Sequence, residues 1–268
     1  MTTTPVLSPP VNLRDLGGTP VAGGTVRPGM LWRADDMSCV TEEWAAQAVS
    51  DGLSHVVDLR SAAEAEATGR GPLGRLPVSY HHVPIFDTVG GGGGADQDVL
   101  AQLARVDVTA VGRTYLTMLR ENAPAIVALL GMIAAASGVT VVHCAAGKDR
   151  TGVLVASVLT ALGAEQDTIV ADYGRTADNL HAIYSRIMSV HGVSAEMLDG
   201  PQAAALAALS RVPVTELPPM MGADPRSMAA MLDLAREEDG GLEQVLRAGG
   251  LTDGLVTALR HRLVDPRG

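Results

Sequence analysis

The sequence predicts an α/β layered domain, because short β-rich runs alternate with helix-favouring stretches and the last β-rich run leads directly into a buried helix. The β-rich runs lie at residues 29–32, 55–59, 79–85 and 139–143. The chain has 268 residues and 47% apolar side chains, so it can bury a sizeable core. This composition excludes a disordered chain and a collagen-like repeat.

Helices are expected between these strands. One begins after Thr41, a suitable N-cap that is followed by Glu42 and Glu43 in the positively polarised first turn. Two more helices are expected at about residues 98–119 and 124–136, and a Ser-Gly pair ends the second of them. The strands and helices thus follow one another in the order that an α/β fold requires.

The second half of the chain is helical in pattern. A buried helix is expected over residues 151–162, directly after the last strand, and a helical run follows over 165–190. Residues 225–264 show only helical periodicity and would supply the closing helices of the domain.

Two segments interrupt this pattern. Residues 88–98 include five consecutive glycines at 90–94, which cannot form a regular element and predict a loop. Residues 192–224 combine a short helix at 202–211 with several prolines, as a lid or an insertion would. Both segments are either surface connections or a cover over an active site.

The charge of the chain restricts its partners. Thirty acidic and 20 basic side chains give a net charge of −10, which argues against nucleic acid and anionic membranes as partners. Of the basic residues 19 are arginine, and the single lysine is Lys148. The position of that lysine is informative, as the motif below shows.

The two cysteines and the N-terminus indicate the compartment. Cys39 and Cys144 are too few for a disulfide scaffold or a cysteine-rich metal site, which favours a reducing compartment. The first residues carry no signal-peptide pattern, and the longest apolar stretches fall short of the roughly 18–20 residues of a membrane span. We expect a cytoplasmic protein without a transmembrane segment, although non-classical secretion would leave no such pattern.

Residues 139–152 carry the most chemical information in the chain. A β-strand ends in Cys144, five residues follow, and then come Arg150, Thr151 and a helix. A loop of this size between a strand end and a helix N-terminus turns its backbone N–H groups inward, and the helix dipole adds positive partial charge. The spacing therefore predicts a cradle for an anion such as a phosphate ester.

The residue types in this loop fit the same chemistry. Gly147 lets the chain turn and approach a ligand closely, and Arg150 offers a planar fork that suits two phosphate oxygens. The positive surroundings favour the thiolate form of Cys144, which can attack phosphorus, and Thr151 could donate to that sulfur when it leaves. The other positions expected to bind substrate are Ala145, Ala146 and Lys148.

The alternative for Cys144 is that it is a small buried hydrophobe, as lone cysteines often are. Six fixed positions, His-Cys-x-x-Gly-x-x-Arg-Thr-Gly, argue against this, because chance would produce them with a probability on the order of one in 10⁵.

The loop resembles the H-C-x5-R-[S/T] signature of cysteine-dependent phosphatases. Its Gly-Lys-Asp-Arg-Thr-Gly form resembles, more narrowly, the bacterial atypical tyrosine/lipid phosphatases related to PtpB and LipA. Other segments that resemble this family are Asn-Leu-Arg-Asp-Leu-Gly-Gly at 12–18, Asp-Leu-Arg-Ser with a following glutamate at 58–64, Ala-Asp-Tyr at 171–173, and the helices of 224–264.

This resemblance implies a single phosphatase domain over residues 1–268, with a central mixed sheet flanked by helices and a helical C-terminal part. It also implies a reaction without metal or other cofactor, in which Cys144 forms a cysteinyl-phosphate that water then hydrolyses. The implied substrate is phosphotyrosine, with phosphoserine, phosphothreonine or phosphoinositides in addition. Its partners would be phosphorylated proteins or phospholipids.

A general acid must protonate the leaving oxygen, and two carboxylates compete for this role. Asp149 lies in the loop itself, whereas Asp87 lies 57 positions before Cys144, where other phosphatases carry an acid on a movable loop. The residues alone leave both open, and the resemblance favours Asp149.

Two other residues of the motif have alternative roles. Lys148 is either a solvated charge at the rim or a second cation that favours substrates with several phosphates, such as phosphoinositides. His143 either orients the cysteine by hydrogen bonds or fills the strand end.

Charges beside apolar strands need partners, so we expect buried ion pairs under the loop. These residues are Arg14, Asp15, Arg33, Asp58, Arg60 and Glu64. His81 and His82 alternate faces of a strand and do not suit one metal, and no metal site is expected. Cys39 is most simply a core residue, with a protective disulfide to Cys144 as the alternative.

Three function classes follow from these observations. The first is an active phosphatase. The second is a phosphate-reading binding module that keeps the loop without turnover, and the third is a rhodanese-like sulfurtransferase, which also places a cysteine in an anion loop. The Arg-Thr-Gly after a five-residue gap favours phosphate over sulfur transfer.

Overall fold

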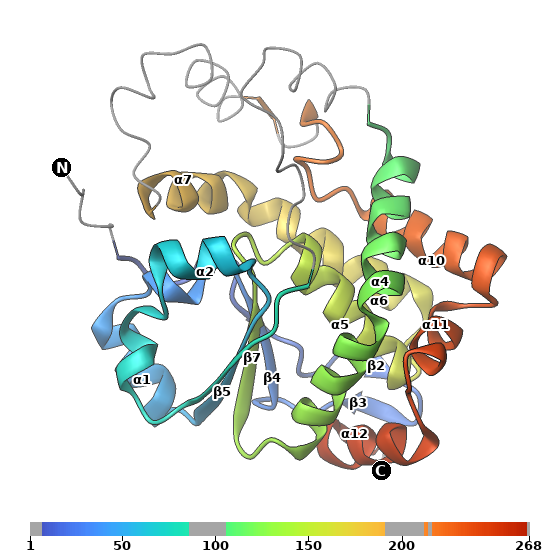
Figure 1. The fold of residues 1–268 in the computed structure, drawn as a ribbon, viewed down its shortest axis with the longest axis horizontal. Helices are drawn as coiled ribbons and strands as arrows, with labels where there is room; N and C mark the ends of the chain where they lie inside the picture. Colours follow the sequence, from blue (N-terminus) through green and yellow to red (C-terminus); the bar gives the residue numbers. More distant parts are fainter. Residues whose placement is uncertain (1–6, 86–105, 191–211, 214–215, 267–268) are drawn as a thin grey trace.

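A mixed five-stranded sheet forms the centre of the computed structural model, which describes residues 7–85, 106–190, 212–213 and 216–266. The strand order is β1-β4-β7-β5-β6. Figure 1 labels the three central strands β4, β7 and β5. Strands β4, β7, β5 and β6 are parallel, and β1 pairs antiparallel with β4 at one edge. The bounds are β1 Arg14–Asp15, β4 Leu31–Ala34, β5 Leu53–Asp58, β6 Ser79–His82 and β7 Val139–His143. The predicted mixed sheet is confirmed.

A second sheet joins the two ends of the chain and was not predicted. It has the antiparallel order β2-β3-β8, with β2 Pro20–Val21, β3 Gly24–Val26 and β8 Val264–Pro266. The predicted helical C-terminal part is confirmed, and the short strand β8 follows its last helix. These strands are too short to show a period of their own, and β8 forms because β3 offers it a partner.

Helices cover both faces of the central sheet (Figure 1). On one side lies α1 (Glu42–Ser50), and on the other lie α4 (Val108–Ala135) and α5 (Asp149–Ala161). Helix α2 (Ala62–Thr68) buries none of its residues. Thr41 caps α1 by accepting a hydrogen bond from the Trp44 N–H, as predicted. Each side has its own hydrophobic core, so the sheet is buried on both faces.

Helix α4 runs without interruption through Pro124, which corrects the prediction of two helices at 98–119 and 124–136. A proline inside a helix removes one backbone donor and disfavours the helix. Here tertiary packing outweighs that cost, because one face of α4 is buried against α5 and three C-terminal helices. By length and composition α4 could also span a membrane, and 44% of its most apolar window is buried inside the protein.

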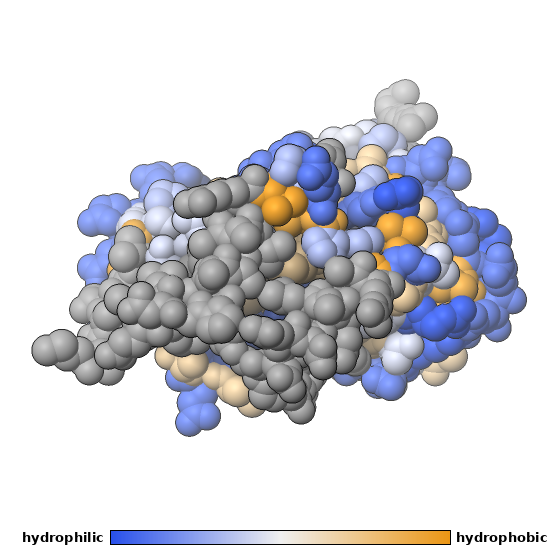
Figure 2. Space-filling model, turned by 90° about the horizontal axis from the view of Figure 1, so that it is seen from above, coloured by the Kyte–Doolittle hydropathy of each residue, from blue (hydrophilic) through white to orange (hydrophobic). Residues whose placement is uncertain are grey.

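The remaining helices surround α4 and α5. The expected run at 165–190 is divided into α6 (Gln166–Gly174), a 3-10 turn (Arg175–Asn179) and α7 (Leu180–Val190). The closing helices are α10 (Pro225–Asp239), α11 (Leu242–Ala248) and α12 (Asp253–Leu263), as predicted. From above, hydrophilic residues cover most of the described surface and a few hydrophobic groups lie toward its middle (Figure 2).

Several predictions lie outside the described residues. These are the loop at 88–98, Asp87, and the helix at 202–211 within the 192–224 segment. The single domain over residues 1–268 stays a prediction.

Candidate active site

The carboxyl ends of three parallel strands meet at one edge of the sheet. His143, the last residue of β7, is in register with Ala34 of β4 on one side and with Asp58 of β5 on the other. Cys144 follows directly and is 2% exposed. Open α/β sheets bind ligands at this edge, and the predicted nucleophile, Cys144, lies on it.

Backbone hydrogen bonds tie the start of the loop to both neighbouring strands. The Asp36 N–H donates to the Ala145 carbonyl at 3.0 Å, and the Leu59 N–H donates to the His143 carbonyl at 2.9 Å. Cys144 is therefore held between two anchored peptides.

Gly147 is required by the path of the loop. Its φ is +65°, and a Cβ atom there would lie 2.3 Å from the Ala34 carbonyl oxygen. Beyond this turn α5 begins at Asp149, with no side-chain cap at Lys148. The first N–H groups of the helix are thus left for another acceptor.

Two side chains hold the loop carbonyls from the protein interior. Asn12 Nδ2 donates to the carbonyls of Ala146 at 3.1 Å and Gly147 at 3.3 Å, and Arg33 Nη2 donates to the Gly147 carbonyl at 2.8 Å. In a trans peptide the N–H points opposite to the carbonyl. The N–H groups of Gly147 and Lys148 therefore point away from the interior, as an anion cradle requires.

A buried ion network supports these donors, as predicted for Arg14 and Arg33. Arg14 Nε lies 3.1 Å from Asp172 Oδ1, and Arg33 Nη1 pairs with the other oxygen of Asp172. Arg14 also donates to Asn12 Oδ1 at 2.8 Å. Burial alone would raise the pKa of Asp172, but the two guanidinium groups lower it, so the carboxylate stays charged.

Among the residues that the structure describes, Asp15 has no ion-pair partner, contrary to the prediction. Its two oxygens accept from the N–H groups of Gly17 at 2.8 Å and Gly29 at 2.6 Å. Both glycines lie in turns whose N–H groups need an acceptor, and the carboxylate supplies it.

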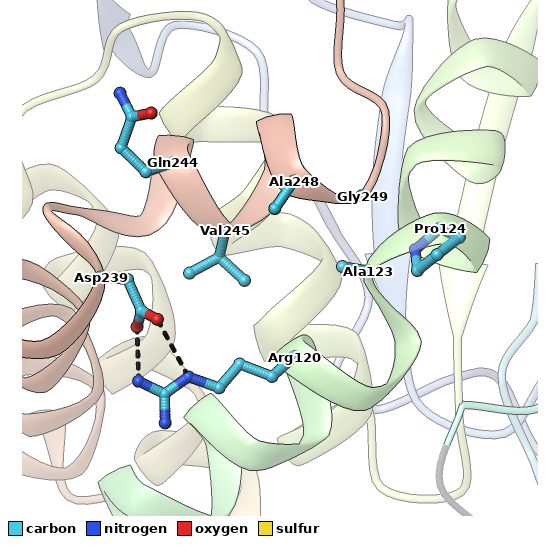
Figure 3. Close-up of a pocket in the computed structure, with 8 residues that line it drawn as sticks. All are labelled: Arg120, Ala123, Pro124, Asp239, Gln244, Val245, Ala248 and Gly249. Carbon is cyan, nitrogen blue, oxygen red and sulfur yellow. Dashed lines mark hydrogen bonds and ion pairs between the residues drawn. The ribbon is translucent and has the colours of Figure 1, made fainter.

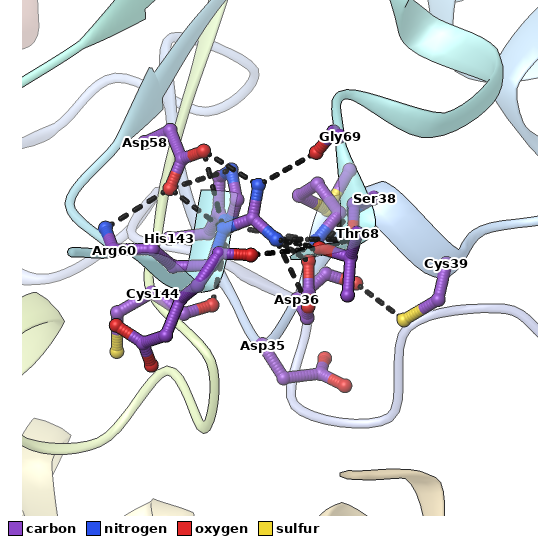
Figure 4. A network of polar contacts seen from close by, with 12 residues as sticks. Asp35, Asp36, Ser38, Cys39, Asp58, Arg60, Thr68, Gly69, His143 and Cys144 are labelled. Atoms are coloured by element: carbon purple, nitrogen blue, oxygen red, sulfur yellow. Dashed lines mark hydrogen bonds and ion pairs between the residues drawn. The ribbon is translucent and has the colours of Figure 1, made fainter. Parts of the chain in front are cut away.

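A second network lies beside Cys144 and centres on Arg60 (Figure 4). Arg60 pairs with Asp58 at 2.7 Å and with Asp36 at 3.1 Å, and the Tyr80 hydroxyl donates to Asp58 at 2.6 Å. These contacts confirm the predicted ion pair of Asp58 and Arg60. They fix the segments that follow β4 and β5, which flank the loop.

His143 contacts the backbone around the cysteine. The Met37 N–H donates to His143 Nδ1 at 3.4 Å, and Nδ1 lies 3.2 Å from the Cys144 carbonyl oxygen. Burial lowers the pKa of His143, so the ring is neutral. Its Nε2 faces Asp58 Oδ1 at 3.8 Å. His143 thus fills the strand end and orders its surroundings.

Glu64, which was expected only in an ion pair under the loop, contacts the predicted catalytic residue Arg150. Its carboxylate accepts from both terminal nitrogens of Arg150, with the Nη2 bond at 2.9 Å. Burial alone would raise the pKa of Glu64, but Arg150 lowers it to about 2. Ser61 holds the same carboxylate through a capping box at the start of α2. The guanidinium group has five N–H donors, and the pair with Glu64 uses two of them.

Asp149 is held at one oxygen. The Tyr115 hydroxyl donates to Oδ1, and Lys148 Nζ lies 3.5 Å from the same atom. The side chain of Asp149 is 17% exposed, so it remains accessible. The competing acid, Asp87, lies outside the described residues.

Lys148 is not the solvated rim charge that was one of its two predicted roles. Its side chain is 3% exposed, and Nζ donates to the carbonyls of Met220 at 2.7 Å and Gly222 at 3.0 Å. Burial alone would lower the pKa of Lys148, but the Asp149 carboxylate beside it raises it, so the cation persists. The Tyr184 hydroxyl donates to the Met221 carbonyl in the same segment. Residues 218–222 therefore cover this lysine.

The remaining groups to describe are the Thr151 hydroxyl, the two cysteines and the possible metal ligands. Within the described part of the chain the buried Thr151 hydroxyl has no hydrogen-bond partner. Both cysteines are free thiols, and burial raises the pKa of Cys39 to about 12, as fits a core residue. Among the same residues, no three His, Cys, Asp or Glu side chains gather as metal ligands.

A separate hollow of about 380 Å³ lies between α4 and α11 (Figure 3). It is bordered by the ion pair of Arg120 and Asp239 at 2.6 Å and by Val245. None of the predicted site residues lines it, so it is not part of the candidate site.

Sequence reasoning did not single out Asn12, Asp172 and Tyr115, which contact the loop or the side chains that hold it. Asn12 and Asp172 stood inside the motifs that carried the resemblance, and those motifs were the signal for them. Tyr115 had no such signal, because it falls on the apolar stripe of α4 like any core residue.

Three known proteins are similar to this chain over part or most of its length. Triple specificity protein phosphatase PtpB of Mycobacterium tuberculosis is 28% identical over 278 residues, which cover 94% of this chain and 96% of PtpB. A Cupriavidus necator protein named as a tyrosine-protein phosphatase is 32% identical over 169 residues, which cover 60% of this chain and 59% of that protein. The solved structure of TpbA from P. aeruginosa with phosphotyrosine has a TM-score of 0.36 and 14% identity, over 70% of this chain and 90% of that one.

The family comparison spans the chain. A model described as the tyrosine phosphatase family matches residues 6–265. This protein therefore belongs to the tyrosine phosphatase family, which confirms the enzyme class that the loop motif predicted.

Proposed function

We propose that this phosphatase hydrolyses phosphotyrosine without a metal, through a cysteinyl-phosphate on Cys144. One observation carries the proposal: Asn12 and Arg33 hold the carbonyls of Ala146 and Gly147 from the interior, and Glu64 holds Arg150, which lies six positions after Cys144. The loop N–H groups and the guanidinium then share one face, where they bind three phosphate oxygens.

The reaction has two steps. In the first, the Cys144 thiolate forms a bond to phosphorus, the ester P–O bond breaks, and the leaving oxygen takes a proton from Asp149. In the second, a water oxygen attacks phosphorus, the S–P bond breaks, and the water proton passes to the Asp149 carboxylate. Inorganic phosphate leaves and the thiolate is restored. Thr151, whose hydroxyl is free among the described residues, stabilises that sulfur.

Phosphotyrosine is the preferred substrate in this proposal, with phosphoserine and phosphothreonine as slower ones. The breadth is suggested by PtpB, which is named a triple specificity phosphatase. A preference for phosphoinositides needs a free second cation. Lys148 does not supply one in this arrangement, because Met220 and Gly222 hold its Nζ. Phosphorylated proteins are therefore favoured as partners over phospholipids.

The proposal includes a cytoplasmic location. The two free thiols support it, because a reducing compartment keeps Cys144 in its active form. Cell fractionation tests this point: recovery of the protein only outside the cell would contradict it.

The central test is hydrolysis of an aryl phosphate in the presence of a chelator. Cys144→Ser is expected to abolish turnover, while Cys39→Ser, a matched change of the other buried thiol, keeps it. Full activity of Cys144→Ser would overturn the proposal. Absence of phosphate release by the wild type would favour the binding module, and thiocyanate formation from thiosulfate and cyanide would favour the sulfurtransferase.

A second test separates the substrates and the acids. Phosphopeptides and phosphoinositides are compared at matched concentration in the wild type, Lys148→Ala, Asp149→Asn and Asp87→Asn. A larger loss of kcat in Asp87→Asn than in Asp149→Asn would reassign the acid. Faster turnover of phosphoinositides than of phosphotyrosine peptides by the wild type would contradict the substrate order.

A further inference from the structure

Two tyrosine hydroxyls lie in the interior behind the loop. Tyr115 of α4 is fully buried, Tyr173 of α6 is 1% exposed, and their rings meet edge to face with centroids 5.9 Å apart. The Tyr115 hydroxyl contacts Asp149 Oδ1 and lies 2.8 Å from the Tyr173 hydroxyl. A buried hydroxyl costs free energy unless it is paired, and phenylalanine would fill the same space. Packing alone therefore does not account for these two groups.

The hydrogen bonds run in one direction. An ionised carboxylate only accepts, so Tyr115 donates its single hydrogen to Asp149, and its oxygen then accepts from Tyr173. Burial and the neighbouring Asp149 carboxylate raise the pKa of both tyrosines above their ordinary range. Both hydroxyls stay protonated, and the chain of donors points at Asp149 throughout the working pH range.

This arrangement distinguishes the two oxygens of Asp149. Oδ1 faces the Tyr115 hydrogen, and the Lys148 ammonium lies 3.5 Å from the same atom. A proton on Oδ1 would lie against the hydrogens of both donors, which disfavours that position. When Asp149 is neutral, its proton therefore sits on Oδ2, and the partly exposed side chain can present it to a leaving group.

We propose that Tyr115 is a positioning residue for the acid step, which keeps the transferable proton on Oδ2 of Asp149, and that Tyr173 fixes the direction of the Tyr115 hydroxyl. The inference rests on the proposed acid role of Asp149. Once the proton has left, the Tyr115 hydrogen bond also stabilises the carboxylate that forms.

Tyr115→Phe tests this directly, because it removes the hydroxyl and keeps the ring. We expect kcat for a phosphotyrosine peptide to fall about 10-fold. For p-nitrophenyl phosphate, whose leaving group needs little protonation, it should fall only about 2-fold. The two losses should therefore differ about 5-fold, a ratio that a merely structural role would leave near one.

Two further variants control this result. Tyr173→Phe removes a hydroxyl that lies one hydrogen bond further from Asp149, and it should change the same ratio in the same direction by a smaller amount. Ser157→Ala removes another buried hydroxyl, which donates to the Val153 carbonyl at 2.8 Å within α5, and should leave both readouts unchanged.

Equal slowing of both substrates by Tyr115→Phe would show a purely structural role and overturn the inference. If Tyr115→Phe does not fold, Tyr173→Phe decides by the same two readouts. Asp149→Asn keeps the two proposals apart: an unaltered leaving-group dependence in that variant would instead refute Asp149 as the acid.

Discussion

Arg33 and Arg150 serve the same loop in different ways. Arg33 is fully buried, and its terminal nitrogens are taken by Asp172 and by the Gly147 carbonyl. The side chain of Arg150 is 13% exposed, and its two terminal nitrogens donate to the Glu64 carboxylate. Positive charge alone therefore does not mark a ligand-binding arginine. What marks it is a set of donors that a ligand can reach.

The two arginines also differ in what their loss should affect. Removal of Arg33 takes one of two cations from the buried Asp172 carboxylate and leaves the Gly147 carbonyl with only the longer bond from Asn12, so the free energy of unfolding should fall before activity does. Removal of Arg150 leaves the half-buried Glu64 without its arginine partner, and kcat/KM should fall before stability does. Substitutions at four residues test this division.

Arg150→Ala should have the largest effect. We expect kcat/KM for an aryl phosphate to fall on the order of 10³-fold or more, because the transition-state charge loses its fork. Arg150→Lys, which keeps the charge without the planar fork, should recover little of that loss. A loss below about 10-fold would place the phosphate on other donors.

Arg33→Met should come next, and its effect should appear in stability. We expect the free energy of unfolding to fall by about 3 kcal/mol, because Asp172 stays buried with Arg14 alone. Urea denaturation measures this. If Arg33→Met keeps wild-type stability and loses as much kcat/KM as Arg150→Ala, the division between the two arginines is wrong.

Glu64→Gln should have an intermediate effect on activity, about a 10-fold fall in kcat/KM, because Arg150 loses its charged partner. It also has a pH signature. The pKa of Glu64 is lowered from 4.5 to about 2, so its stabilising effect is complete above pH 4.5 and is lost as pH falls toward 2. Urea unfolding at pH 7 and pH 3 should show a steeper loss in the wild type than in Glu64→Gln. Parallel losses would contradict the pairing.

Arg120→Gln should have the smallest effect. Arg120 pairs with Asp239 and Glu238 at the surface hollow of Figure 3, with a third of its side chain exposed. We expect a change in stability of about 0.5 kcal/mol and wild-type kcat/KM. A marked loss of activity would give that hollow a role in the reaction.

The sequence predicted best those parts whose cause is local. The strand of Val139–His143, the turn at Gly147 and the helix after it follow from residues that are adjacent in the chain. The cap at Thr41 is of the same kind. The predicted roles of Cys144, Arg150 and Asp149 stay predictions until turnover is measured.

The parts that could not be predicted depend on distant partners. Strand β8 exists only because β3 lies beside it, and Pro124 is tolerated because tertiary packing holds α4. Burial of Lys148 depends on carbonyls more than 70 positions away, and the Tyr115 hydroxyl reaches Asp149 across 34 positions. No local sequence pattern predicts such long-range contacts.

The most direct test of the account is to trap the phosphoenzyme. Wild-type protein mixed with a phosphotyrosine peptide is quenched within the first turnover, digested and analysed by mass spectrometry. The account predicts phosphate on the peptide that contains Cys144, and none there in Cys144→Ser. Turnover with phosphate on another residue, or undiminished turnover by Cys144→Ser, would contradict it.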